Sequence, residues 1–345
     1  MKDCIVITSP SLVKEVVRDQ DVIFANRGNP TVAVRSFLFG TMDISFSNYG
    51  HELRKMRKVF VSEMMNNGDT LKGGKSNTVN AEFRALRTEQ MEHLGAPNTS
   101  DLFPLLARYD LQGIERRMKI ITRRCENILD SAINNHNSGE NNKQKGFLGH
   151  LLHLTKFENP ATSLTLPQVK ALLMDAVIGG TDTTATTVEW VVAEMLQHPQ
   201  VMRKVQEELT EIVGLNNIVE EVHLPKLKYL KAVVKETLRL HPSIPLLFPH
   251  CPIKASISSI PFGSGRRICP GISLAERNSM LVLASLLHSF HWNLPNGSVE
   301  VDTSERFGIV VKKAKPLFAV PVSPVLFGNL LENAEHHYLS GRSGD

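Results

Sequence analysis

Apolar residues recur at helical spacing along most of the chain, and polar stretches separate these segments. The spacing predicts helices over 10–19, 51–65, 80–94, 110–136, 167–213, 225–240 and 272–289. A break is expected near His198-Pro199, and the helix over 225–240 should end before Pro242, because the residue before a proline disfavours helix. Weak alternation over 306–322 predicts short strands. The pattern therefore predicts a mainly α protein with a small β portion.

The remaining stretches have the composition of loops. They are the Gly- and Ser-rich residues 37–47, the aperiodic residues 66–80, the polar linker 134–146 and a Pro- and Ser-rich loop that ends at 271. No internal repeat is present, and residues 323–345 have no obvious packing role. We therefore expect a single domain over 1–322, followed by a disordered tail over 323–345.

Composition excludes several classes of protein. The 39 Lys and Arg against 35 Asp and Glu leave a net charge of +4, too small to indicate nucleic-acid binding. Four cysteines without a C-x-x-C pair argue against a disulfide framework or structural zinc, and fit a reducing compartment. The N-terminal segment reads as neither a signal peptide nor a membrane anchor.

The most specific stretch is PFGSGRRICPG, residues 261–271, which surrounds Cys269 with glycines directly before a helix. An iron-bound thiolate needs N–H donors around its sulfur, and glycine permits such close backbone approach. The N-terminus of the helix near Ile272 also favours an anionic sulfur. Arg266 is positioned to pair with a carboxylate of a cofactor.

A phosphate site and a nucleophilic cysteine are the alternatives for this loop. A Gly-rich turn before a helix often binds phosphate, but Ile268 occupies a position where G-x-G-x-x-G requires glycine, and no G-K-[ST] follows. A nucleophilic cysteine would require a histidine base, which no nearby motif indicates.

The helix over 169–196 contains GGTDTTATT, residues 179–187, at its centre. Two glycines and several β-branched threonines weaken a helix, so the run marks either a packing accommodation or a place where a ligand crosses the backbone. Asp182 beside Thr183 in an otherwise apolar helix favours a function, because buried carboxylates are rare without one.

Two further predicted helices, over 225–240 and 51–65, carry charged residues that are candidates for a role. Glu236 and Arg239 lie three residues apart on one helix face, which by itself describes a solvated ion pair. Arg57 lies in a basic helix that is equally well explained as a solvated face.

Together these motifs resemble the cytochrome P-450 superfamily of haem-thiolate monooxygenases. FGSGRRICPG matches that family's F-x-x-G-x-R-x-C-x-G pattern at every fixed position, GGTDTT is similar to [AG]-G-x-[DE]-T-[ST], and KETLR is similar to E-x-x-R. The resemblance implies a P-450-like fold, haem b as cofactor and Cys269 as axial ligand of the iron. It implies cofactor-binding roles for Phe262, Gly263, Gly265, Arg266, Gly271 and Arg57.

The resemblance also implies roles for the other two motifs. Asp182 and Thr183 would hold oxygen and relay protons to it, and Glu236 with Arg239 would brace the core. Where the family commonly has W-R-x-x-R, Leu53 replaces the tryptophan and only Arg57 remains as a donor.

Several segments resemble plant enzymes of the geraniol 8-hydroxylase-like group, among them ALLMDAVIGGTDTT and FGIVVKKAKPL. That likeness implies a small apolar, terpenoid-like substrate, O2, electrons from an NADPH-cytochrome P-450 reductase, and the cytosolic face of the endoplasmic reticulum membrane. Substrate contacts would come from apolar loop and helix positions: Ala176, Gly180, Ile244, Leu247 and Ile309.

The chain is shorter between two of these motifs than the family that it resembles. Only 30 residues separate Arg239 from Cys269, where the family has several tens more, including the element that locks the E-x-x-R pair. We therefore expect internal deletions near 65–70 and 252–260, an incomplete fold, and a poorly compensated charge on Arg239. The alternative to a monooxygenase is a non-catalytic remnant of one.

Overall fold

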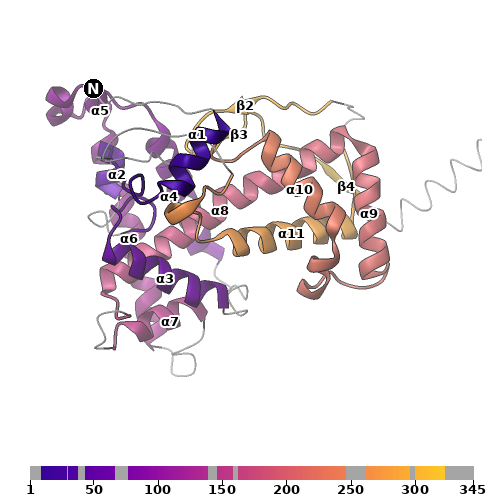
Figure 1. Ribbon diagram of the computed structural model, residues 1–345, viewed down its shortest axis with the longest axis horizontal. Coiled ribbons are helices and arrows are strands. Elements are labelled where there is room, and N and C mark those ends of the chain that lie inside the picture. The colour runs from indigo at the N-terminus through magenta and orange to yellow at the C-terminus, as the bar shows by residue number, and fades with distance from the viewer. Residues whose placement is uncertain are drawn as a thin grey trace, which may run out of the picture. The chain divides into compact units, whose positions relative to one another are not determined.

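The computed structural model describes residues 9–28, 30–37, 43–66, 77–138, 146–157, 162–245, 261–295 and 300–322. Most of these residues are helical (Figure 1). The helices are α1 (Pro10–Lys14), α2 (Val32–Phe37), α3 (His51–Asn66), α4 (Asn77–Gly95), α5 (Thr99–Leu102), α6 (Ile114–Ser138), α7 (Gly146–Leu154), α8 (Leu166–Gln197), α9 (Pro199–Val213), α10 (Lys228–Leu240) and α11 (Ile272–Ser289). A π-helical turn follows α1 at Glu15–Asp19, and 3-10 turns lie at Pro104–Tyr109, Glu221–Lys226 and Gly265–Arg267.

Strands are few and short among the described residues. Strand β1 (His291–Asn293) pairs antiparallel with β4 (Val320–Val322), with His291 opposite Val322. Strand β2 (Glu305–Arg306) pairs antiparallel with β3 (Lys312–Lys313), with Glu305 opposite Lys313. The predicted strands over 306–322 are thus found as parts of two small sheets.

The chain forms two compact units. The first comprises Met1–Asp182, Ile244–Leu274 and Phe307–Val310, and the second comprises Thr183–Ser243, Ala275–Arg306 and Val311–Asp345. Helix α8 passes from one unit into the other at Asp182. The single domain expected over 1–322 remains a prediction, and the tail 323–345 lies outside the described residues.

Among the described residues, the core of the first unit has two large apolar clusters, beside a small one of Val13, Val16, Val17 and Phe24. In one, the buried side chains of Leu53 and Met56 from α3 pack with residues of α7 and the first half of α8. In the other, α2, α4 and α6 meet around Met118 and Ile121, both fully buried. Because apolar residues at helical spacing face one another here, the first half of α8 lies against both clusters.

The core of the second unit is one cluster made by the second half of α8 with α9, α10 and α11. Val191 and Met195 of α8, Leu209 of α9, Leu230 of α10 and Leu283 of α11 are all fully buried in it. Figure 1 shows α9 beside α10, joined by the turn at Glu221–Lys226.

Most predicted helices lie where expected, including the break at His198-Pro199 between α8 and α9. Helix α8 is continuous through Gly179-Gly180, as predicted, because apolar packing on both sides outweighs the low helix propensity of the run. Helix α6 extends to Ser138, so the predicted linker begins later than residue 134. The short elements α2, α7 and β1 were not predicted. None of the described helices combines the length and the apolar character needed to cross a bilayer.

Candidate functional site

The loop around Cys269 is built by backbone geometry that only glycine adopts easily. Gly263 and Gly265 both have positive φ, +67° and +60°. A Cβ on Gly265 would overlap the carbonyl oxygen of Val17 and lie 2.8 Å from the Cβ of Asp21. The loop is closed by the amide of Cys269, which donates to the carbonyl of Phe262 at 2.9 Å. The spacing of glycines around the cysteine is thus what allows this segment to close against residues 17–21.

The Cys269 thiol is half-buried directly before α11. Burial raises its pKa, whereas the N–H of Gly271 that points at the sulfur and the nearby charge of Arg57 act in the opposite direction. Arg57, on α3, donates from Nη2 to the carbonyl of Ile268 at 2.5 Å. A cation and an N–H donor therefore both lie next to the sulfur, which is the environment that stabilises a thiolate once a metal takes the place of its proton.

The two arginines of the loop point in different directions. Arg266 lies at the surface, where its backbone N–H and its guanidinium bond Asp21 and its Nη1 donates to the Tyr49 hydroxyl at 2.5 Å. Arg267 is buried and donates to the carbonyls of Ala25, Ile44 and Ser47. Counted from Cys269, the fixed arginine of F-x-x-G-x-R-x-C-x-G is Arg267, so the motif itself held the signal that pointed to the buried residue.

Arg267 belongs to a buried cluster of charged groups in the first unit. Burial, and then the neighbouring Arg267, lower the pKa of Arg27 to about 9, and burial followed by repulsion from Arg57 lowers the pKa of Arg267 to about 10. Burial also raises the pKa of Asp43 to about 6, although Arg267 and Arg27 attract its charge. Three desolvated guanidinium groups close to one another are the donor set that carboxylate groups match.

Asp175 completes this cluster from α8. It accepts hydrogen bonds from the amide of Ile44 at 2.7 Å and the hydroxyl of Ser45 at 3.0 Å. Burial and the charge of Asp43 hold its pKa well above the usual range for an aspartate. Asp175 was not among the predicted site residues, although its position inside an apolar run was a signal of the same kind as that of Asp182.

The motif at the centre of α8 has a part of the helix surface that none of the described residues covers. Gly179 and Gly180 are exposed, and a Cβ added to either would meet nothing within 4 Å. Among the described residues these glycines do not serve close packing, which favours the ligand alternative for this run. Asp182 and Thr183 are half-buried at consecutive positions, and Arg87 lies near enough to Asp182 for their charges to interact.

The pair Glu236 and Arg239 has the geometry expected from its spacing but not the burial. Two hydrogen bonds join the side chains, at 2.9 Å and 2.7 Å, and both side chains are more than half exposed. The bonds to Arg239 lower the pKa of Glu236. The expectation that Arg239 is a poorly compensated charge is therefore wrong for the described residues, because Glu236 and water both compensate it.

A Glu236→Gln, Arg239→Gln double variant is accordingly expected to unfold thermally at nearly the same midpoint as the parent chain. An exposed, screened ion pair contributes little to stability. Circular dichroism on heating measures this midpoint. A large drop, or the loss of a cooperative transition, would show that the pair is structurally essential.

The remaining predicted residues are distributed as follows. Phe262 is half-buried and takes part in closing the loop through its carbonyl. Ala176 packs against the first core cluster, and Ile244 and Ile309 are half-buried. Leu247 and the predicted deletion at 252–260 lie outside the described residues, as does most of that at 65–70.

Comparison with known proteins identifies the family. The family model described as cytochrome P-450 matches residues 1–86, 74–258 and 252–320, so the chain belongs to the cytochrome P-450 family. Geraniol 8-hydroxylase of Catharanthus roseus is 30% identical over 417 aligned residues, which cover 92% of this chain and 84% of that enzyme. Flavonoid 3',5'-hydroxylase of Campanula medium is 33% identical over 300 residues, covering 71% of this chain and 57% of that enzyme.

Solved structures agree on the fold. A zebra fish cytochrome P-450 solved with progesterone superposes with a TM-score of 0.73 at 22% sequence identity, covering 92% of this chain and 93% of that one. The predicted fold class and the likeness to plant enzymes of this family are thereby confirmed. Since 417 aligned positions exceed the 345 residues of this chain, many positions of geraniol 8-hydroxylase have no counterpart in it.

Proposed function

We propose that this chain is a haem-thiolate monooxygenase that inserts one atom of O2 into a small lipophilic, terpenoid-like substrate. The observation that carries this proposal is the loop at 261–271, which presents the half-buried Cys269 sulfur to the N–H of Gly271 and matches the family pattern at every fixed position. Membership in the cytochrome P-450 family supports a monooxygenase activity. The substrate class is suggested by the names of relatives, geraniol 8-hydroxylase and salviol synthase among them.

The residues present fit haem b. Cys269 would hold the iron, and Arg57, Arg267 and Arg27 would hold the two carboxylates of the porphyrin, because these guanidinium groups are desolvated and held close to one another. Gly263, Gly265 and Gly271 keep side chains away from the loop, and Phe262 fastens it through its carbonyl. When bound, haem would supply the redox chemistry that splits O2.

The chain's own residues would transfer protons and leave room for a small molecule. The carboxylate of Asp182 would take up a proton from solvent, and the hydroxyl of Thr183 would pass it on towards the part of the α8 surface that no described residue covers. Gly179 and Gly180 would leave room there for a small molecule. Gly180, Ala176, Ile244, Leu247 and Ile309 remain the proposed apolar contacts of the substrate.

Electrons would come from NADPH through a membrane-bound NADPH-cytochrome P-450 reductase, and the chain would work at the cytosolic face of the endoplasmic reticulum. Both proposals rest on membership in the cytochrome P-450 family and on the resemblance to its plant members. We also propose, from the small net charge of +4, that nucleic acid is not a partner.

A second proposal, a non-catalytic remnant, is favoured by one specific observation. Leu53 takes the place of the family's tryptophan and is buried in the apolar core beside Met56, so α3 supplies Arg57 as its remaining donor to a haem carboxylate. A remnant of this kind would keep the fold while holding haem weakly.

The carbon monoxide difference spectrum of the reduced, haem-supplemented chain separates the two proposals. A far-red-shifted Soret band is expected for a thiolate-ligated haem. Incubation with a plant reductase, NADPH and a panel that includes geraniol should then yield hydroxylated product. A spectrum without that band would establish the remnant, and a band without product from any substrate would reject the proposed substrate class.

A further inference from the structure

Arg87, on α4, is a buried arginine whose hydrogen-bonding capacity is largely unused among the described residues. The residue is only 5% exposed. Its Nη1 donates to the side-chain oxygen of Gln90, which lies one turn later on α4. The Nε and Nη2 of Arg87 and the Nε2 of Gln90 are buried and meet no hydrogen-bond partner among the described residues. Because an unsatisfied buried donor costs stability, these three donors point to a partner from outside the chain.

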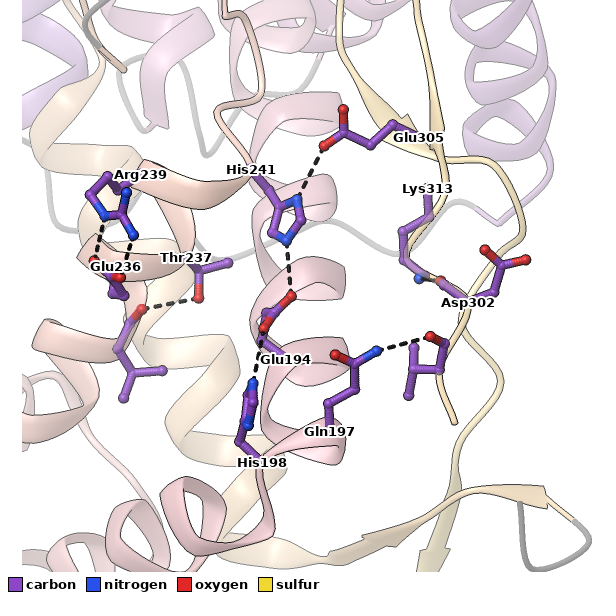
Figure 2. A network of polar contacts seen from close by, with 12 residues as sticks. Glu194, Gln197, His198, Glu236, Thr237, Arg239, His241, Asp302, Glu305 and Lys313 are labelled. Carbon is purple, nitrogen blue, oxygen red and sulfur yellow. Dashed lines mark hydrogen bonds and ion pairs between the residues drawn. The ribbon is translucent and has the colours of Figure 1, made fainter. Parts of the chain in front are cut away.

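The two unpartnered nitrogens of Arg87 are those that bind a carboxylate side-on. The N–H bonds of Nε and Nη2 point in the same direction, and this fork fits the two oxygens of a carboxylate. Figure 2 shows such a fork with its carboxylate at Arg239 in the second unit, where Nε and Nη2 bond the two oxygens of Glu236 at 2.9 Å and 2.7 Å. The fork of Arg87 has the same donors and no carboxylate among the described residues.

The surroundings of Arg87 leave its charge poorly compensated. The preceding residue, Leu86, belongs to the buried apolar cluster of α2, α4 and α6. Burial lowers the pKa of Arg87 to about 10, whereas the charges of Cys125 and Asp182 act in the opposite direction. Cys125 is not ionised at neutral pH, because burial raises the pKa of its thiol to about 11. Asp182 is therefore the anion that competes for Arg87, and it does not occupy the fork.

The stretch of α8 next to Asp182 offers room for the rest of a ligand. Gly179 precedes Asp182 by three residues and so lies on the same side of the helix. A Cβ added to Gly179 or Gly180 would meet nothing within 4 Å. A ligand with a carboxylate at one end and an apolar body would place the carboxylate on Arg87 and the body along this stretch.

We propose that Arg87 and Gln90 bind the carboxylate of a small apolar acid, with the guanidinium fork on its two oxygens and the Nε2 of Gln90 as a third donor. This inference rests on the proposed function, because it takes the acid to be the substrate of the monooxygenase. It narrows the substrate class from lipophilic molecules in general to lipophilic molecules that carry one carboxylate. The buried cation destabilises the chain by itself, and the bound acid offsets that cost.

Geraniol and geranic acid are matched probes, since they share a carbon skeleton and differ in an alcohol or carboxylate end. Calorimetric titration of the haem-supplemented chain at neutral pH, where a carboxylic acid is ionised, measures the binding of each. Arg87→Gln is expected to weaken the binding of geranic acid about 10- to 100-fold, as for the loss of charge-assisted hydrogen bonds. The binding of geraniol should change little. No binding of geranic acid to the parent, or an equal loss for both probes, overturns the proposal.

Two further variants separate the fork from charge alone. Arg84→Gln removes an exposed arginine one turn earlier on α4 and should leave the affinity for geranic acid intact. Arg87→Lys keeps the buried charge without the fork and should recover only part of the affinity. An equal loss in Arg84→Gln and Arg87→Gln, or full affinity in Arg87→Lys, contradicts the site.

A stability measurement tests the site without haem or turnover. In the absence of ligand, Arg87→Met is expected to unfold thermally at a higher midpoint than the parent, because it removes an uncompensated buried charge and keeps an apolar side chain of similar length. Saturating geranic acid should raise the midpoint of the parent and not that of Arg87→Met. A lower midpoint in Arg87→Met would show that the guanidinium serves the fold, and would overturn the proposal.

The carboxylate site and the proposed function fail in different ways. A thiolate-type carbon monoxide band without Arg87-dependent binding of geranic acid keeps the monooxygenase and rejects the acid. Arg87-dependent binding in a chain without that band keeps the carboxylate site and rejects the monooxygenase. Hydroxylation of geraniol but not of geranic acid by the parent would reject the acid as substrate.

Discussion

A Cys269→Ser chain is expected to lose the thiolate-type carbon monoxide band completely. Serine keeps the size of the side chain, but its alcohol is not ionised near neutral pH and does not replace a thiolate on iron. The loop itself should survive, because it is closed by the amide of residue 269 and by Gly263 and Gly265, not by the sulfur. The difference spectrum and the molar ratio of haem to protein measure both effects.

Cys125→Ala is the matched control for this variant. Cys125 is buried on α6, where burial raises the pKa of its thiol to about 11, so it is an inert core residue. Its replacement should lower stability modestly and leave the band intact. A band that survives in Cys269→Ser, or disappears in Cys125→Ala, would contradict the assignment of the iron ligand.

Replacing Asp43 by asparagine is expected to stabilise the chain at neutral pH. The pKa of Asp43 is raised to about 6 by burial, and that value already includes the attraction of Arg267 and Arg27. A rise of about two units corresponds to a cost of roughly 3 kcal/mol for ionising the buried group. Asparagine keeps the acceptor for the Phe46 amide, which is bonded at 2.6 Å, without carrying the charge. Chemical denaturation at several pH values measures the difference.

The sign of the pH dependence follows from the direction of the shift. Because the pKa of Asp43 is higher in the folded chain, its contribution to stability is fully present below about pH 4, the unfolded value, and is lost as the pH rises through about 6. The advantage of Asp43→Asn should therefore be small at about pH 4 and reach its full size above about pH 6. An advantage that is the same at every pH would exclude the buried charge as its cause.

In the same experiment, Asp302→Asn is expected to change the stability of the chain in the opposite direction from Asp43→Asn. Hydrogen bonds from Lys315 and Ser304 lower the pKa of Asp302, so its contribution is present above the unfolded pKa and lost as the pH falls. This variant should be less stable than the parent at neutral pH, and the deficit should shrink in acid.

Motifs and periodicity predicted a large part of this molecule. The loop around Cys269 could be found because only a few residue types permit its backbone, and the long helices because their apolar spacing matches the packing of both cores. The continuity of α8 through Gly179-Gly180 was predicted from apolar periodicity and not from propensity, since glycines disfavour a helix.

Charged side chains were harder to place than apolar ones. We expected Arg266 to face a cofactor, although the family pattern counted from Cys269 fixes Arg267. The surroundings, Asp21 and Tyr49 for Arg266 and three carbonyls for Arg267, show that Arg267 is the buried residue. The same spacing that identified Glu236 and Arg239 carried no information about their exposure. The contacts of His241 with Glu194 and Glu305 could not be predicted from the sequence, because these partners lie 47 and 64 residues away from it.

The contacts of the cysteine loop with residues 17–27 have a consequence for biosynthesis. Asp21 and Ala25 precede their partners Arg266 and Arg267 by 245 and 242 residues. At roughly 5–20 residues per second, the ribosome completes the loop about 10 to 50 s after the N-terminal turn has emerged. During that interval Gly265 is not yet there to fit against Val17, and Asp21 has no arginine to bind. The loop around Cys269 therefore closes late in synthesis, and a chaperone that shelters the early turn should raise the yield of correctly closed chains.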